Sequence, residues 1–153
     1  MKLYNGWRLY AFEPFAERLA ALKKEVERLR AKDPEGYRRH PTTALLASVY
    51  KAITEVVPAD PDHSEFRVGH SLGPQYAHWR RVKRGLPPRY RLFYRFSSNP
   101  VRMIVYVWLN DEVTLRKVGA KTDVYAVFQR MLARGEVPSD IDALTKGGSA
   151  IEE

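Results

Sequence analysis

The residues whose types are best suited to bind or react with a ligand lie between positions 76 and 112, where basic and aromatic side chains alternate. No Asp or Glu occurs from Phe66 through Asn110, although carboxylates are common on both sides of this interval. Arginine forks match phosphate oxygens, and aromatic rings can stack on unpaired bases. The pattern therefore predicts contact with a nucleic acid. Its basic members are Arg80, Arg81, Lys83, Arg84, Arg89, Arg91 and Arg95, and its candidate stacking residues are Tyr76, Trp79 and Phe93.

Cleaving RNA would need proton-transfer groups in addition to this charge. Attack by a 2′-hydroxyl requires a base for that hydroxyl, cations for the crowded phosphorus and an acid for the leaving oxygen. Asp111, Glu112, a desolvated Lys83 or Tyr125 could transfer protons. Each of these carboxylates could instead have a purely structural role at the start of a helix, and Tyr125 could instead be a core residue.

The histidines form no convincing metal set. His40, His63, His70 and His78 lack zinc-ligand spacing, and cysteine is absent. No phosphate-binding glycine loop or dinucleotide fingerprint occurs either, so we expect neither a metal nor another cofactor. His70 and His78 fall in a loop beside the basic stretch, and an acid–base pair made from them stays open as an alternative.

The length and composition predict one soluble domain, and the net charge predicts an anionic partner. The chain has 153 residues, a formal net charge of +8 and no cysteine, which fits a reducing compartment. No apolar run approaches the ~20 residues of a membrane span, and the first residues lack the apolar core of a signal peptide. We therefore expect a cytoplasmic protein that does not contact membranes.

The first half of the chain predicts a strand followed by two helices. Residues 7–12 alternate weakly and suit a strand at a sheet edge. Apolar positions at spacings of three and four then predict a helix over residues 14–32. A second helix should start at Thr42 or Thr43, either of which can cap it, and stop at Pro58. These two helices should form an antiparallel hairpin.

The basic stretch predicts three antiparallel strands, because the links between them are short. The last of these, residues 101–110, is apolar almost throughout and should be a central strand. The middle one divides by period 2. Tyr90, Leu92, Tyr94 and Phe96 fall on one face, and Arg89, Arg91, Phe93 and Arg95 fall on the other. We expect the helices to cover the apolar face and leave the arginine face open.

The last third predicts one more helix. Thr122 or Asp123 can cap it, apolar residues from 124 to 132 form its buried side, and Gly135 suits its end. From Ser139 onward the chain has little to bury. We therefore expect a single domain over residues 1–138 and a flexible tail over residues 139–153.

Several short motifs in order resemble one known family, the YhaV toxins of type II toxin–antitoxin systems, within the RelE superfamily of mRNA interferases. The matching segments are residues 5–7, 32–35, 71–73, 79, 81–83, 89–93, 108, 110–112, 114–116, 121–123, 125, 131–132 and 134–135. They run from about Asn5 to Pro138 at nearly the family's spacings. The chain departs from the RelE pattern at residues 110–112, where many relatives place a histidine or an arginine.

The resemblance implies a fold and an activity. The fold would be α+β and RelE-like, with an N-terminal strand and a helical hairpin packed on a twisted antiparallel sheet, and a C-terminal helix. The activity would be metal-independent endoribonuclease cleavage of mRNA, usually at the ribosome. By position, the catalytic residues would be Arg81, Lys83, Arg91, Asn110, Asp111 and Glu112. The RNA-binding residues would be Trp79, Arg80, Arg84, Arg89, Arg95, Arg116 and Lys121.

The resemblance also implies partners. A PrlF-type antitoxin of the swapped-hairpin class would neutralise the toxin, and operator DNA would be bound only through that antitoxin. Two alternatives to an enzyme stay open at this point. One is a non-catalytic nucleic-acid-binding module or transcriptional co-repressor, and the other is a scaffold whose basic face docks an acidic partner.

Overall fold

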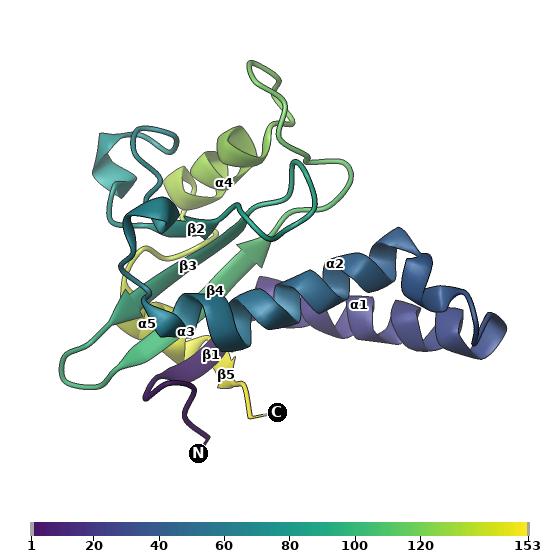
Figure 1. Ribbon diagram of the computed structural model, residues 1–153. Coiled ribbons are helices and arrows are strands. Elements are labelled where there is room, and N and C mark those ends of the chain that lie inside the picture. The colour runs from purple at the N-terminus through teal and green to yellow at the C-terminus, as the bar shows by residue number, and fades with distance from the viewer. Residues whose placement is uncertain (1, 153) are drawn as a thin grey trace.

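A five-stranded sheet between two helical layers forms the centre of the molecule (Figure 1). The computed structural model describes residues 2–152. The strand order is β2-β3-β4-β1-β5, with β1 parallel to β4 and every other pair antiparallel. The strands are β1 (Arg8–Phe12), β2 (Arg80–Val82), β3 (Leu92–Ser97), β4 (Met103–Leu109) and β5 (Gly148–Ala150). The α+β class is confirmed, and so is the central place of the apolar strand β4.

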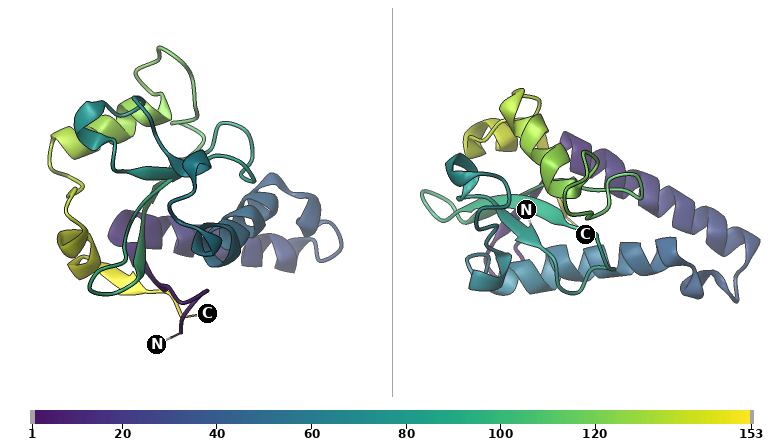
Figure 2. Two further views of the ribbon diagram at one scale, coloured as in Figure 1. Left: turned by 60° about the vertical axis from the view of Figure 1, so that its left-hand side comes forward. Right: turned by 90° about the horizontal axis from the view of Figure 1, so that it is seen from above.

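One face of the sheet is covered by the predicted hairpin of α1 (Glu13–Lys32) and α2 (Pro41–Lys51). Phe15 and Leu19 of α1 pack there against Tyr106 and other residues of the sheet. The far end of the hairpin extends beyond the sheet (Figure 2), so Val26 and Leu29 of the same stripe are only half-buried. The structure starts α2 one residue before the predicted threonines.

The second helix starts with a different cap than predicted but ends close to its predicted stop. The His40 side chain, not a threonine, caps α2 by accepting a hydrogen bond from the backbone N–H of Thr42 at 3.2 Å. The helix runs through a π-helical segment (Ala52–Val56) into α3 (Val57–Ala59) and ends one residue after Pro58, its predicted stop. In this segment, the Ile53 carbonyl accepts a hydrogen bond from the buried Tyr106 hydroxyl at 2.8 Å. This bond holds the π-helical segment on the sheet.

The other face of the sheet is covered by α4 (Val124–Ala133) and α5 (Ile141–Lys146). Phe128 of α4 stacks on Phe93 with 4.2 Å between ring centroids. This is the face that carries Arg91 and Phe93, which we expected to be open. That expectation is wrong, because period 2 assigns residues to a face but cannot say what packs there.

The C-terminal segment, for which we expected a flexible tail, forms α5 and β5 and packs on the sheet. Leu144 of α5 is fully buried, and β5 pairs with β1 at the edge of the sheet. For this reason β1 is an inner strand, and its predicted edge position is also wrong. A single apolar helix turn followed by Gly-Ser-Ala has too little local pattern to reveal such a strand.

Candidate active site

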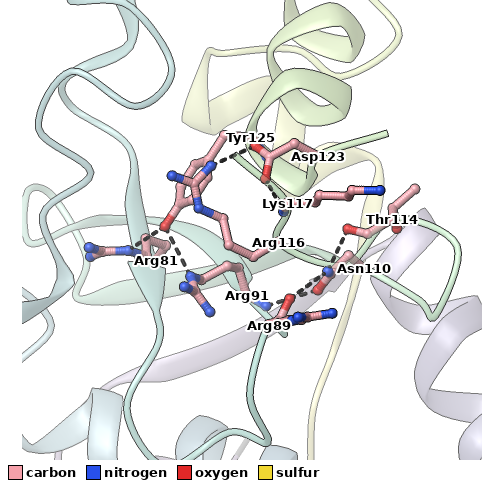
Figure 3. Close-up of polar contacts among 9 residues, drawn as sticks. All are labelled: Arg81, Arg89, Arg91, Asn110, Thr114, Arg116, Lys117, Asp123 and Tyr125. Carbon is pink, nitrogen blue, oxygen red and sulfur yellow. Dashed lines mark hydrogen bonds and ion pairs between the residues drawn. The ribbon is translucent and has the colours of Figure 1, made fainter. Parts of the chain in front are cut away.

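Two arginines and a tyrosine meet where β2, the start of β3 and the first turn of α4 come together (Figure 3). Arg81 Nε donates to the Tyr125 hydroxyl oxygen at 2.9 Å, and Arg91 Nε donates to the same oxygen at 3.1 Å. We call these three residues the arginine–tyrosine cluster. The hydroxyl oxygen accepts from two guanidinium groups, so its own proton is available to a third group.

Backbone carbonyls fix both arginines in place. Arg81 Nη1 donates to the carbonyls of Glu65 and Arg67 at 3.0 and 2.7 Å, and Arg91 Nη1 donates to the Tyr90 carbonyl at 2.8 Å. Among residues 2–152, neither guanidinium forms an ion pair with a carboxylate. Two positive charges are therefore held close together without a counter-charge. Such a pair favours an anion between them.

Arg116 completes the surroundings of Tyr125, but its charge is compensated. Its guanidinium carbon lies 4.9 Å from the centre of the Tyr125 ring, and its Nη1 pairs with Asp123 at 2.8 Å. The buried Asp123 carboxylate also accepts the backbone N–H groups of Lys117 and Tyr125. Burial opposes ionisation of Asp123, but these hydrogen bonds and Arg116 outweigh it, so the pKa of Asp123 lies below its ordinary value.

Asn110 positions the cluster from within the protein. It is fully buried, its Oδ1 accepts from the Arg91 backbone N–H at 2.8 Å, and its Nδ2 donates to the carbonyls of Arg89 and Thr114. The same Arg89 carbonyl accepts from the Arg116 N–H at 3.0 Å. Arg89 itself has a φ of +73°, a left-handed conformation that these bonds help to hold. Asn110 thus links the backbones that carry Arg91 and Arg116.

The two predicted carboxylates lie apart from this cluster. Asp111 Oδ1 accepts from the N–H groups of Val113 and Thr114 and from the Thr114 hydroxyl, which makes it a turn-forming residue. Glu112 is exposed and lines a groove beside Arg18 and Tyr90 on the hairpin side of the sheet. No described hydrogen bond joins either carboxylate to the arginine–tyrosine cluster.

Four residues predicted to contact RNA are held instead by contacts within the protein. Trp79 is fully buried, packs edge-on against Phe128 and donates to the Ser139 hydroxyl, so its predicted role in base stacking is wrong. Arg95 lies over the Trp79 ring and donates to the Ser139 carbonyl. Arg80 points to the hairpin side and pairs with Asp62 at 2.9 Å. Phe93, another predicted stacking residue, is also fully buried.

The remaining predicted RNA contacts are exposed at the surface. Lys83, Arg84, Arg89 and Lys121 all lie in loops with solvent-accessible side chains. Arg84 lines a groove beside α2, away from Tyr125. Their roles stay predictions.

The histidines have structural or peripheral places. His40 and His63 each accept a backbone N–H at the start of a helix. The side chains of His70 and His78 are largely exposed. Partial burial, together with the positive charges of Arg95 and Arg80, lowers the pKa of His78. In the part of the chain that the structure describes, no three His, Cys, Asp or Glu side chains are grouped as a metal site would require. None of its helices combines the length and apolar character needed to cross a membrane.

Sequence reasoning gave too little weight to Tyr125 and did not predict the ion pair of Asp123. Tyr125 was the most remote of the proton-transfer candidates, since it lies 44 residues after Arg81. Asp123 was expected only as a helix cap, a role that its hydrogen bond to the Tyr125 N–H confirms. The signal that favoured both residues was the motif over residues 121–125 that carries the family resemblance.

Comparison with known proteins shows the family of the chain. The sequence profile of the YhaV toxins, described as toxins with endonuclease activity of toxin–antitoxin systems, matches residues 9–149. The chain belongs to this family, as its sequence predicted. It is 49% identical over 143 residues to the ribonuclease toxin YhaV of Escherichia coli strain K12, which covers 93% of this chain and 92% of the relative. The YhaV toxins of E. coli O157:H7 and O6:H1 match to the same extent. No solved structure gives a significant match.

Proposed function

We propose that this protein is the toxin of a type II toxin–antitoxin system and cleaves mRNA without a metal ion at the arginine–tyrosine cluster. The observation that carries this proposal is the convergence of Arg81 and Arg91 on the Tyr125 hydroxyl. It puts two guanidinium groups without carboxylate partners beside one proton-bearing group. Those are the cation and acid functions that RNA cleavage by an internal hydroxyl needs.

The reaction follows from this arrangement. The scissile phosphate binds between Arg81 and Arg91, whose guanidinium groups stabilise the charge that develops on its oxygens. The 2′-oxygen of the preceding ribose forms a bond to phosphorus, and its proton passes to water. The bond from phosphorus to the 5′-oxygen breaks, and Tyr125 donates its proton to that oxygen. The products are a 2′,3′-cyclic phosphate and a 5′-hydroxyl, and Tyr125 regains its proton from solvent.

Other residues named from the sequence have supporting roles in this proposal. Asn110 and Asp111 position the loop that follows β4, because their side chains are bonded within the protein. The exposed Lys83, Arg89 and Lys121 contact the flanking RNA backbone through charge. Lys83 follows Arg81 by two residues, which brings it to the same side of the chain.

The partners and the finer fold class rest on family membership and on the motif resemblance. We propose a PrlF-type swapped-hairpin antitoxin as the neutralising partner, the ribosome as the place where mRNA is met, and the cytoplasm as the compartment. Operator DNA would be bound through the antitoxin only. The hairpin on a largely antiparallel sheet supports assignment to the RelE-like folds.

Expression of the chain in a bacterial host tests this function. We expect growth arrest and mRNA fragmentation, and relief of both when the neighbouring antitoxin gene is co-expressed. Purified protein incubated with RNA, with and without ribosomes, then shows whether ribosomes are needed. Binding of RNA without cleavage under both conditions would favour the non-catalytic nucleic-acid-binding module instead.

A further inference from the structure

A small pocket adjoins Tyr125 on the side of α4, separate from the polar contacts of Arg81. Its volume is about 270 Å³, and it is lined by Ser71, Arg116, Asp123, Tyr125, Ala126 and Gln129. This volume lies just below the range of ~300–1,000 Å³ that holds drug-sized ligands, so a single aromatic heterocycle is a suitable occupant. The reaction described above uses only Tyr125 of these residues.

The wall formed by Arg116 is suited to stacking. Its guanidinium is held by Asp123 on one edge and lies over the Tyr125 ring, while its side chain remains 34% exposed. A guanidinium plane fixed in this way can take a base on its free side, since bases stack on arginine planes as well as on aromatic rings. Because Asp123 compensates its charge, Arg116 is less suited than Arg81 or Arg91 to hold phosphate.

Another residue of the lining, Gln129, can read the edge of a base. Gln129 lies one helical turn after Tyr125, so both side chains project from the same side of α4. Its amide offers one donor and one acceptor, the pair that adenine matches with N7 and N6. Ala126 adds only a methyl group to the lining, and the exposed Ser71 adds a hydroxyl.

We propose that this pocket, which we call the base pocket, binds an unstacked nucleobase next to the scissile phosphate, with adenine preferred. The inference rests on the proposed function, because Tyr125 belongs to both sites. Its hydroxyl faces the phosphate between the arginines, and its ring side adjoins the pocket. A base bound there therefore belongs to a nucleotide that flanks the bond being broken.

Binding of short RNAs blocked by a 2′-O-methyl group at the scissile position tests the base pocket without cleavage. Each oligonucleotide carries adenine, another base or an abasic residue at the flanking positions. For the unmodified protein, we expect the abasic RNA to bind about tenfold more weakly than the adenine RNA. Gln129→Ala should remove most of the difference between adenine and the other bases. Gln75→Ala is the matched control, because the chain's other glutamine lies outside the pocket lining.

The outcomes separate the base pocket from the nuclease itself. Loss of adenine preference in Gln129→Ala but not in Gln75→Ala supports the pocket. Equal binding of adenine and abasic RNA by the unmodified protein overturns it, as does a Gln129→Ala variant with unchanged preference. The same RNAs with a free 2′-hydroxyl report cleavage separately. If adenine-dependent binding occurs without cleavage, the proposed reaction fails and the base pocket stands.

Discussion

Arg80 and Arg81 are neighbours in sequence, yet they lie on opposite faces of β2 in different electrostatic surroundings. Arg80 faces the helical hairpin, where Asp62 compensates its charge and the Phe96 ring lies beneath its guanidinium. Arg81 faces α4, where its hydrogen bonds go to carbonyls and to the Tyr125 hydroxyl. A positive charge that is already paired stabilises the fold, whereas one held without a counter-charge can bind an anion.

Arg91 and Arg95 also differ in their contacts, although both are in the predicted arginine face. Arg95 donates to the Ser139 carbonyl and packs on Trp79, so it joins the C-terminal segment to the sheet. Arg91 is 8% exposed and directs its Nε at Tyr125. The arginines of this stretch therefore fall into two groups, those that stabilise the fold and those that can bind an anion. The contacts of each side chain distinguish the two groups.

The largest expected effect is the loss of cleavage in Arg81→Ala. Removing one preorganised donor to the transition-state phosphate should lower the cleavage rate by about 100- to 1,000-fold. Arg80→Ala should leave the rate near that of the unmodified protein and change the free energy of unfolding by about 1 kcal/mol, since Asp62 is largely exposed. RNA cleavage and chemical denaturation of both variants measure the contrast. Equal loss of activity in the two variants would contradict it.

Tyr125→Phe should give the next largest effect. It removes the proton donor but keeps the ring, so we expect the cleavage rate to fall about 100-fold. A substrate whose leaving 5′-oxygen is replaced by sulfur needs no acid, and Tyr125→Phe should cleave it nearly as fast as the unmodified protein does. If the sulfur substrate is not rescued, Tyr125 acts by positioning the arginines and not as the acid.

Asp123 gives a pH-dependent contribution to stability. Its folded pKa lies below the unfolded value, so the stabilisation is present at pH above about 4 and is lost as the pH falls through the folded pKa. Asp123→Asn keeps a helix cap but loses the ion pair with Arg116. We expect it to lower the free energy of unfolding by about 1–2 kcal/mol at neutral pH and by less in acid. A difference that is independent of pH would show that the carboxylate charge is not responsible.

The smallest expected effect is that of Glu112→Gln. Glu112 faces the groove on the hairpin side, away from Tyr125, so cleavage should stay within about twofold of the unmodified rate. Cleavage rates of this variant and the unmodified protein, measured over a range of pH around neutrality, check this prediction. A large loss would restore Glu112 as the proton-transfer group suggested by the sequence.

Much of the fold followed from local pattern in the sequence. Apolar spacing located α1 and α2, alternation located β3, and a nearly continuous apolar run located β4. Asp123 was among the predicted caps of α4. What covers each face of the sheet did not follow, because it depends on contacts between distant segments. Leu144 and the short strand β5 were missed for the same reason, since neither shows a period of its own.

The candidate site was predicted in its charges but not in its geometry. Arg81 and Arg91 were singled out as residue types that bind phosphate, which stays a prediction, and nothing in the local sequence places them on the Tyr125 hydroxyl. Asn110 was taken for a catalytic residue, and burial shows that its amide groups are used within the protein. Trp79 was taken for a stacking residue because an exposed and a buried tryptophan look alike in sequence.

The most direct test of the arginine–tyrosine cluster as a metal-independent nuclease is the chemistry of its products. A defined RNA is incubated with the purified protein in excess EDTA, with ribosomes added if they are needed, and the fragment ends are identified by mass spectrometry. We predict 2′,3′-cyclic phosphate or 3′-phosphate ends opposite 5′-hydroxyl ends, and their absence with Arg81→Ala. Cleavage that requires magnesium, or that leaves 5′-phosphate and 3′-hydroxyl ends, would contradict the account.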